Sequence, residues 1–142
     1  MINQLESEIR FFKVGLQLFL SSGFKTVDEL VQRGCKVMLD LKFFDIPETV
    51  HLAVSQLNNR GVTFATVHGN DPILRAAAQA KGDVKILAVT VLTSFFEEDM
   101  RAMGLSGSIA DLVLRRSRKA LEIGCDGVVA SALEAQPLRD AL

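Results

Sequence analysis

Hydrophobic residues along this chain gather into five short runs, separated by longer stretches with the spacing of amphipathic helices. Each run is apolar nearly throughout, as parallel strands are when helices cover the sheet. The alternation predicts repeated strand–helix units around a parallel sheet, an α/β architecture. The expected strands are residues 10–17, 36–43, 63–69, 85–92 and 126–131.

Short polar signals mark where the intervening helices should begin. Segments 26–29, 94–97 and 131–134 each have Ser or Thr followed three residues later by Glu, the spacing of a capping box. Asp71 can cap a helix that holds Pro72 in its first turn. Glycines, which accept the left-handed conformation, stand where helices should stop, at positions 34, 61, 82 and 124.

Two architectures fit five strand–helix units. An open doubly wound sheet of the flavodoxin type would be complete near 142 residues, whereas an eight-stranded barrel typically needs about 250. Length alone favours the open sheet. However, the chain begins in what reads as the tail of a helix, residues 3–9, and stops inside or just after another, residues 134–142. Both ends look cut, which favours part of a barrel.

Composition and charge narrow the class of protein. With 49% hydrophobic residues and a net charge of −1, residues 1–142 are expected to form one soluble domain. A chain without a basic stripe is not expected to bind nucleic acid. The absence of a signal-peptide pattern and of any membrane-spanning run predicts a cytoplasmic protein. Cys35 and Cys125 have no metal-ligand spacing and are expected to be buried free thiols.

Polar residues collect within or just after the predicted strands, on the side from which the next helix departs. In barrels and in open α/β sheets alike, ligands bind at that carboxyl-end edge. So many polar residues at one edge predict a binding or catalytic site. They are Lys13, Asp40, Lys42, His68, Thr90, Thr93, Ser94 and Ser131.

The densest charge lies in "VMLDLKFFDIPETV", residues 37–50, where Asp40 and Lys42 share one face of the strand. A structural ion pair is the ordinary explanation of such a pair. That explanation leaves out Asp45, which could instead cap the next helix. An alternating Asp–Lys–Asp array could also hold a charged proton donor in a dry site. Lys13 could extend the array or reach solvent.

Five segments together resemble the orotidine 5'-phosphate decarboxylase family, and they occur in the family's order over almost the whole chain. The segment "DLKFFDIP" is highly specific, whereas the others would be weak alone. The looser Asp-x-Lys-x-x-Asp pattern is shared with sugar-phosphate decarboxylases of the same superfamily, but "DIP" and "VTVLTS" favour the orotidylate branch. The segments are "FFKVGLQLF", "DLKFFDIPETV", "TVHG", "AVTVLTS" and "DGVVASALEA".

The resemblance implies a fold and an activity. The expected fold is a (β/α)8 TIM barrel that works as a homodimer, without metal or organic cofactor. The expected reaction is the loss of CO2 from orotidine 5'-monophosphate, which gives UMP in pyrimidine nucleotide synthesis.

The resemblance also implies roles for particular residues. Lys42 would donate the proton to the carbanion-like carbon left by CO2, and Asp40 would lie beside the departing carboxylate. Lys13 would bind the ribose region and Thr93 the pyrimidine. His68 matches a family position, and we expect a structural role for it.

A second group of residues would serve the neighbouring subunit. Asp45, Ile46 and Thr49 would reach into the partner's site, so that the complete charged array would form across the dimer interface.

The family pattern is only partly represented, since the segments correspond to barrel strands two through six. The first, seventh and eighth strands, with the loops that hold the substrate phosphate, are not found. Binding energy from such remote groups supports catalysis, so the chain alone is expected to be a weak catalyst or inactive. An incomplete barrel also has unpaired sheet edges, which allows the alternative of a non-catalytic, self-associating module.

Overall fold

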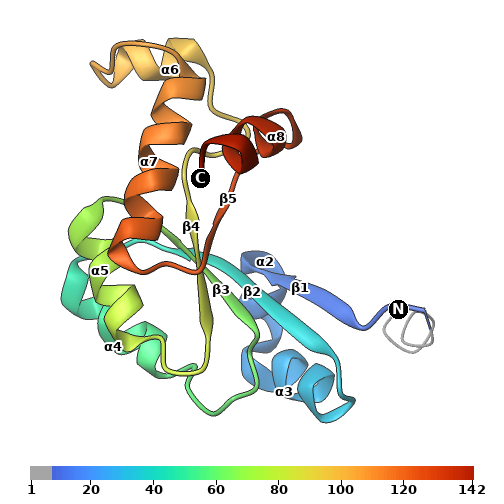
Figure 1. Ribbon diagram of the computed structural model, residues 1–142. Helices are drawn as coiled ribbons and strands as arrows, with labels where there is room; N and C mark the ends of the chain where they lie inside the picture. Colours follow the sequence, from blue (N-terminus) through green and yellow to red (C-terminus); the bar gives the residue numbers. More distant parts are fainter. Residues whose placement is uncertain (1–7) are drawn as a thin grey trace.

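The computed structural model describes residues 8–142, which form a five-stranded parallel sheet flanked by helices (Figure 1). The α/β class expected from the hydrophobic runs is therefore confirmed. The strands are β1 (Phe11–Gly15), β2 (Lys36–Phe43), β3 (Phe64–His68), β4 (Lys85–Val89) and β5 (Gly127–Val129). The helices are α2 (Leu16–Ser22), α3 (Phe24–Gln32), α4 (Pro47–Ser55), α5 (Asp71–Ala80), α6 (Glu97–Ala102), α7 (Ile109–Ile123) and α8 (Ala132–Ala141).

The order of the strands decides between the two architectures. The strands lie side by side in the order β1-β2-β3-β4-β5, and every neighbouring pair is parallel. A doubly wound sheet reverses its strand order at a switch point, and this sheet has no such reversal. Sequential parallel order is the order of barrel strands. The open flavodoxin-type sheet is therefore excluded for the described residues.

The predicted strands all form, but most are shorter than the apolar runs that predicted them. The prediction of 36–43 matches β2 at both ends. In contrast, the run 85–92 ends as a strand at Val89, and residues 90–96 form a loop. Val91 lies beyond the end of β4 but is still buried. An apolar run therefore does not show where the hydrogen bonds between neighbouring strands stop.

Helix starts were predicted less well than strands. Thr26 and Glu29 lie inside α3, which begins after Gly23, so the capping box predicted there is wrong. At α6 the capping carboxylate belongs to Asp99, which accepts a hydrogen bond from the Phe96 N–H at 2.8 Å. The predicted box at 94–97 is thus displaced by two residues.

Most of the remaining cap predictions fall at or next to their expected positions, but the helix stop predicted at Gly61 is wrong, because α4 already ends at Ser55. Glu134 accepts a hydrogen bond from the Ser131 N–H at 2.6 Å, as the box at 131–134 predicts. The N-cap of α5 is Asn70, so Asp71 and Pro72 occupy the first two helical positions. Gly124 ends α7 with a φ of 106°, a left-handed conformation that glycine adopts without a steric penalty.

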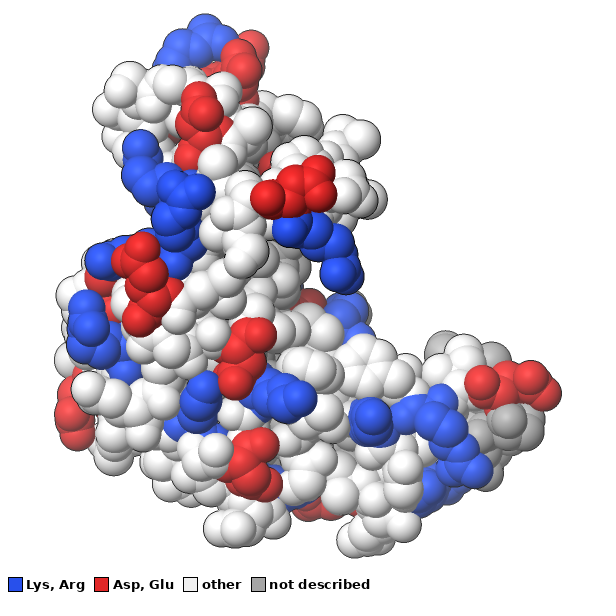
Figure 2. All heavy atoms as spheres, in the orientation of Figure 1, with Lys and Arg blue, Asp and Glu red and all other residues white. Residues whose placement is uncertain are grey.

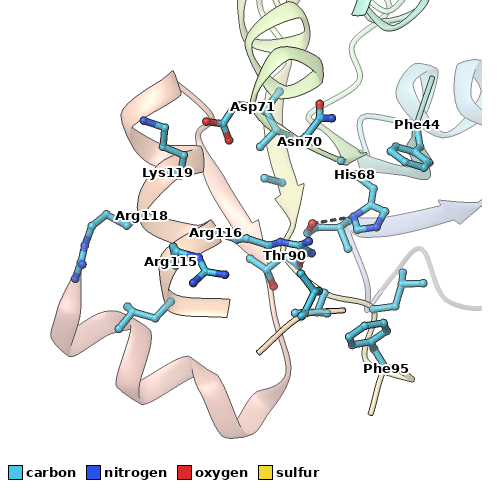
Figure 3. Close-up of a pocket in the computed structure, with 18 of the residues that line it drawn as sticks. Phe44, His68, Asn70, Asp71, Thr90, Phe95, Arg115, Arg116, Arg118 and Lys119 are labelled. Carbon is cyan, nitrogen blue, oxygen red and sulfur yellow. Dashed lines mark hydrogen bonds between the residues drawn. The ribbon is translucent and has the colours of Figure 1, made fainter. Parts of the chain in front are cut away.

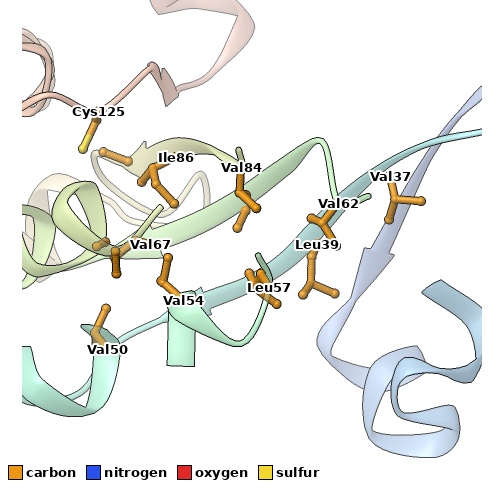
Figure 4. Close-up of a cluster of buried hydrophobic side chains, with 14 of the residues drawn as sticks. Val37, Leu39, Val50, Val54, Leu57, Val62, Val67, Val84, Ile86 and Cys125 are labelled. Atoms are coloured by element: carbon orange, nitrogen blue, oxygen red, sulfur yellow. The ribbon is translucent and has the colours of Figure 1, made fainter. Parts of the chain in front are cut away.

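The main hydrophobic core lies between the sheet and the helices that cover it (Figure 4). Val37 and Leu39 from β2, Val67 from β3 and Ile86 from β4 meet Val54 from α4 there, all with no exposed surface. Alternate residues of each strand supply this core, which leaves the other residues of β2 and β3 on the opposite face. That opposite face carries Asp40 and Lys42.

A second, smaller cluster joins the last three helices to the sheet. Met100 from α6, Leu112 and Val113 from α7 and Leu138 from α8 are buried together with Val91. In Figure 1 α6 and α8 stand beyond the carboxyl ends of β4 and β5, and α7 runs beside β5. The cluster therefore holds the region around the carboxyl-end edge.

Both cysteines are free and buried, as the sequence predicts. Burial raises the pKa of the Cys125 thiol to about 11, and the neighbouring Lys81 and Asp126 act in opposite directions on it. Within residues 8–142 no helix is long and apolar enough to cross a membrane. Charges of both signs are interspersed on the face of the molecule seen in Figure 2.

Candidate active site

Asp40 and Lys42 form an ion pair near the carboxyl end of β2, with Lys42 Nζ 2.9 Å from Asp40 Oδ1. The carboxylate side chain is only 12% exposed, whereas the lysine side chain is 39% exposed. The pair is therefore half enclosed by the sheet and open on the lysine side.

The backbone at this pair is not a regular strand. Lys42 has a φ of 50°, and the register between β2 and β3 shifts between Leu39 and Phe43. A lysine in the left-handed region is uncommon, and such strain often lies at functional sites. Sequence alternation predicts the shared face of Asp40 and Lys42, but it does not predict this irregularity.

Lys13 completes a row of charges across two strands. β1 pairs with β2 so that Gly15 lies opposite Asp40, and Lys13 Nζ reaches Asp40 Oδ2 at 3.2 Å. The Lys13 side chain is 57% exposed. Both alternatives for this residue thus hold in part: it joins the network while much of it faces solvent.

The Asp40 carboxylate also accepts a hydrogen bond from a residue that the sequence analysis missed. Thr66, in β3, donates from Oγ1 to Asp40 Oδ1 at 2.9 Å and has no exposed surface. A signal was present, because Thr66 is the one polar residue before His68 in an otherwise apolar strand. The sequence does not show that β3 lies beside β2 at this register, so the contact could not be predicted.

These contacts set the charge of the Asp40 carboxyl. Burial acts to raise its pKa, but the hydrogen bonds from Lys42, Thr66 and Lys13 outweigh burial and lower the pKa below the ordinary value of 3.8. The carboxylate is therefore ionised at neutral pH and lies between two ammonium groups. Such an arrangement can hold a proton donor in place and can stabilise charge that develops near it. We call Lys13, Asp40, Lys42 and Thr66 the charged centre.

The other predicted site residues do not reach the charged centre of their own chain. Asp45, Ile46, Thr49 and Thr93 are exposed, and within the described residues none of them forms a hydrogen bond or ion pair with Asp40. Asp45 Oδ1 accepts a hydrogen bond from the Ile46 N–H at 2.7 Å. The N-cap of α4 is Ile46, so the alternative of Asp45 as the N-cap is wrong by one residue.

His68 lies at the end of β3 and makes a contact typical of a structural residue. Its Nδ1 is 3.0 Å from the Val89 carbonyl oxygen, and because that oxygen can only accept, Nδ1 carries the hydrogen. The ring also packs against Phe44, with 5.4 Å between ring centroids. These contacts fit the structural role expected for His68.

A cavity of about 1000 Å³ opens beside His68, between the ends of β3 and β4 and helix α7 (Figure 3). Arg116 points into it and donates to the Thr90 carbonyl oxygen at 2.7 Å, which fixes the start of the loop after β4. Burial, and then the neighbouring Arg115, lower the pKa of this guanidinium. The lining includes no member of the charged centre, so the cavity does not contain the centre.

No group of three or more His, Cys, Asp or Glu side chains in residues 8–142 is arranged to hold a metal ion.

The fold and the charged centre together define an α/β chain with barrel-type strand order and an Asp–Lys site at its carboxyl-end edge. The chain belongs to the Orotidine 5'-phosphate decarboxylase / HUMPS family, whose sequence profile matches residues 1–141. The resemblance inferred from "DLKFFDIP" is therefore confirmed at the level of the family.

Curated relatives are similar over nearly the whole chain. It is 54% identical over 140 residues to "Orotidine 5'-phosphate decarboxylase" of Methylococcus capsulatus, a match that covers 98% of this chain and 58% of that relative. It is 49% identical over 141 residues to the enzyme of the same name from Nitrobacter winogradskyi, a match that covers 98% of this chain and 59% of that relative. The chain thus spans less than two thirds of the length of these relatives.

A solved structure supports the same assignment. The crystal structure of orotidine 5'-phosphate decarboxylase from Lactobacillus acidophilus superposes with a TM-score of 0.87 at 34% identity, covering 98% of this chain and 69% of that one. Structures of this kind are TIM barrels, so the five-stranded sheet is part of a barrel architecture, as expected from the resemblance.

Proposed function

We propose that this chain carries the reaction centre of an orotidine 5'-phosphate decarboxylase, which converts orotidine 5'-monophosphate to UMP in pyrimidine biosynthesis. The observation that carries the proposal is the Asp40 carboxylate, which is ionised and lies between the ammonium groups of Lys42 and Lys13. Family membership and the 54% identity to the Methylococcus capsulatus relative support it.

In this reaction the bond between the pyrimidine ring and its carboxylate breaks, CO2 leaves, and the electron pair stays on the ring carbon. The Lys42 ammonium donates a proton to that carbon, which completes UMP, and later regains a proton from water. A fixed positive charge near the developing carbanion lowers the energy of the transition state. Asp40 orients Lys42 and lies beside the departing carboxylate, where like-charge repulsion favours its loss.

Two further residues are proposed to bind the substrate, Lys13 at the ribose and Thr93 at the pyrimidine. The loop that carries Thr93 follows β4 at the same edge of the sheet as the charged centre. The proposed reaction needs neither a metal ion nor an organic cofactor, since the charged side chains act on the substrate directly. The substrate is a small molecule, and no nucleic-acid partner is proposed.

Asp45, Ile46 and Thr49 are proposed to act in the site of a second copy of the chain, in a homodimer. Two observations support this proposal. These residues are exposed and do not contact their own charged centre, and Phe44 and Ile46 beside Asp45 are each 66% exposed. Burying large apolar side chains of this kind between two subunits is favourable.

The dimer can be tested by sedimentation velocity. Ile46→Glu is expected to shift the chain toward monomer, because a charge would enter the interface. Leu133→Glu is the matched control, since Leu133 lies on α8 and is 90% exposed without being part of the proposed interface. Equal sedimentation of both variants and the wild type would count against the assigned interface.

We also propose that residues 1–142 act as one domain of a cytoplasmic protein. The continuous five-stranded sheet supports the single domain.

The decarboxylase proposal is tested by a graft. The part of this chain that matches the Methylococcus capsulatus enzyme replaces the corresponding segment of that enzyme, which supplies the rest of the protein. We expect the graft to convert orotidine 5'-monophosphate to UMP with no metal added. The fall in pyrimidine absorbance measures this conversion. The same exchange with the Nitrobacter winogradskyi segment shows whether the host tolerates a segment swap. A folded but inactive graft beside an active control graft would overturn the proposal.

One alternative is a related sugar-phosphate decarboxylase, because the Asp-x-Lys-x-x-Asp pattern of Asp40, Lys42 and Asp45 is shared with such enzymes. Binding to the 142-residue chain separates the two. UMP should shift the amide signals of the charged centre if the orotidylate assignment holds, whereas a pentose phosphate should shift them more strongly under the alternative. A non-catalytic, self-associating module would respond to neither ligand.

A further inference from the structure

Thr66 is a buried polar residue in the middle of a sheet. Its neighbours in β3, Ala65 and Val67, point into the main core, and Thr66 points to the opposite face, toward Asp40. A buried hydroxyl without partners would be costly, so its hydrogen bonds show what the position is used for. Thr66 has two of them, and both go to the charged centre.

The two hydrogen bonds of Thr66 use its hydroxyl as donor and as acceptor. Oγ1 donates to Asp40 Oδ1 at 2.9 Å, and it accepts from the Lys42 N–H, also at 2.9 Å. One hydroxyl therefore ties the side chain of Asp40 to the backbone of Lys42. Since Lys42 Nζ also donates to Asp40 Oδ1, the three residues form a closed ring of hydrogen bonds.

The backbone of β2 explains why Lys42 needs a side-chain partner. The register shift between Leu39 and Phe43 interrupts the regular ladder with β3, and Lys42 has the left-handed φ of 50°. A buried or half-buried N–H that leaves the ladder must find another acceptor. Thr66 Oγ1 is that acceptor, and it holds Lys42 in a conformation that lysine seldom adopts.

We propose that Thr66 is the positioning residue of the charged centre: its hydroxyl fixes the Asp40 carboxylate and the Lys42 backbone so that the lysine ammonium stays against Asp40. The proposal rests on the proposed function, in which Lys42 donates the proton. Without this hydroxyl, the partly exposed Lys42 side chain can turn away from Asp40 toward water.

The first test needs no catalytic activity and uses the 142-residue chain. Thr66→Val keeps the shape of the side chain but removes both hydrogen bonds. We expect exchange of the Lys42 amide hydrogen to become roughly 3- to 10-fold faster relative to other β2 amides. We also expect the pKa of Asp40, followed by carboxyl carbon NMR, to rise because one of its hydrogen bonds is lost.

Thr63 provides a matched control in the same region of the sheet. Its Oγ1 accepts from the Val37 N–H at 3.3 Å, at the opposite end of β2 from the charged centre. Thr63→Val removes the same type of contact but should leave the Lys42 amide and the Asp40 titration unchanged. Thr66→Ser retains the hydroxyl and should restore both signals. If Thr66→Val does not fold, Thr66→Ala takes its place in the same measurements.

The second test uses the graft enzyme and asks whether positioning matters to the reaction. Thr66→Val is expected to lower kcat about 10- to 100-fold while KM changes less than about threefold, since the charged groups remain but are less well held. Thr66→Ser should recover most of kcat. A purely structural role would instead lower the amount of folded enzyme and leave kcat per folded molecule unchanged.

The outcomes separate this proposal from the proposed function. Unchanged exchange of the Lys42 amide and an unchanged Asp40 pKa in Thr66→Val would overturn the positioning role, whatever the activity. If both signals change as expected but the wild-type graft is inactive beside an active control graft, then the decarboxylase assignment fails and the geometric role of Thr66 stands.

Discussion

Two Asp–Lys pairs lie at opposite edges of the same sheet, and each has an N–O distance of 2.9 Å. Asp40 and Lys42 are near the carboxyl end of β2. Asp126 and Lys81 are at the amino-end edge, where Asp126 precedes β5 and Lys81 follows α5. Residue type and distance therefore do not distinguish a candidate reaction centre from a structural contact.

The further partners of each pair make the difference. Asp126 Oδ2 also accepts from the Ile86 N–H at 2.8 Å, and Lys81 also donates to the Gly124 carbonyl oxygen at 2.8 Å. The pair thereby joins the end of α5 to the end of α7 and to the start of β4. These hydrogen bonds give the pair a structural role.

At the carboxyl-end edge the carboxylate has many donors but the lysines have few acceptors. Asp40 accepts hydrogen bonds from Lys13, Lys42 and Thr66, whereas each of the two ammonium groups has Asp40 as its one acceptor within residues 8–142. Ammonium protons without a second protein acceptor remain available to a ligand. A site is therefore recognised by the hydrogen-bonding capacity that the protein leaves unused.

The largest expected effect is on catalysis in the graft enzyme. Lys42→Ala removes the proposed proton donor and should lower kcat by at least about 10²- to 10⁴-fold. Lys81→Ala removes the other lysine and should change kcat by less than about threefold. Steady-state kinetics on both variants measures the contrast. A similar loss of kcat in Lys42→Ala and Lys81→Ala would show that the two edges of the sheet do not differ in function.

The next effect is on stability, where we expect the Asp126 pair to matter more than the Asp40 pair. Asp126→Ala leaves the N–H of the fully buried Ile86 without its acceptor, so the free energy of unfolding should fall by about 1–3 kcal/mol. Asp40→Asn keeps an acceptor for Thr66 and lets both lysines turn to water, so its cost should stay below about 1 kcal/mol. Urea denaturation of the 142-residue chain measures both changes. A larger loss at Asp40 would contradict the assigned roles.

A smaller effect is expected from pH. Because hydrogen bonds lower the pKa of Asp40 in the folded chain, its ionised form contributes stability above the unfolded value of 3.8. That contribution is lost as the pH falls through the lower, folded pKa. The stability difference between the wild type and Asp40→Asn should therefore shrink below pH 3.8, as measured by urea denaturation from pH 6 to about pH 2.5. A difference independent of pH would show that the carboxylate is not stabilised by its donors.

The smallest effect concerns the Cys125 thiol, which lies next to Asp126. Its pKa of about 11 and its burial should make it react slowly with a disulfide reagent at pH 8, because little thiolate is present. Asp126→Ala should speed the reaction by loosening the amino-end edge, whereas Asp40→Asn should not. The absorbance of the released thiolate follows the rate. A fast reaction in the wild type would show that this edge opens readily.

The sequence predicted the sheet well because buried parallel strands need continuous apolar runs. All five strands form within those runs, and β2 matches its predicted range at both ends. The helix starts at Thr26 and Ser94 were predicted wrongly, because the spacing of Ser or Thr and Glu does not by itself fix where a helix begins: α3 begins at Phe24 and α6 at Glu97. Local signals therefore located elements better than their ends.

The sequence by itself determined the α/β class and the presence of Asp40, Lys42 and Lys13 at strand ends, since these follow from hydrophobic period and position along one strand. Only the tertiary structure decided the sequential strand order, the left-handed backbone at Lys42 and the contact with Thr66. Those features depend on which strands become neighbours and at what register. Neighbouring strands meet through contacts between residues more than 20 positions apart, such as Asp40 and Thr66, and no local pattern encodes such a contact.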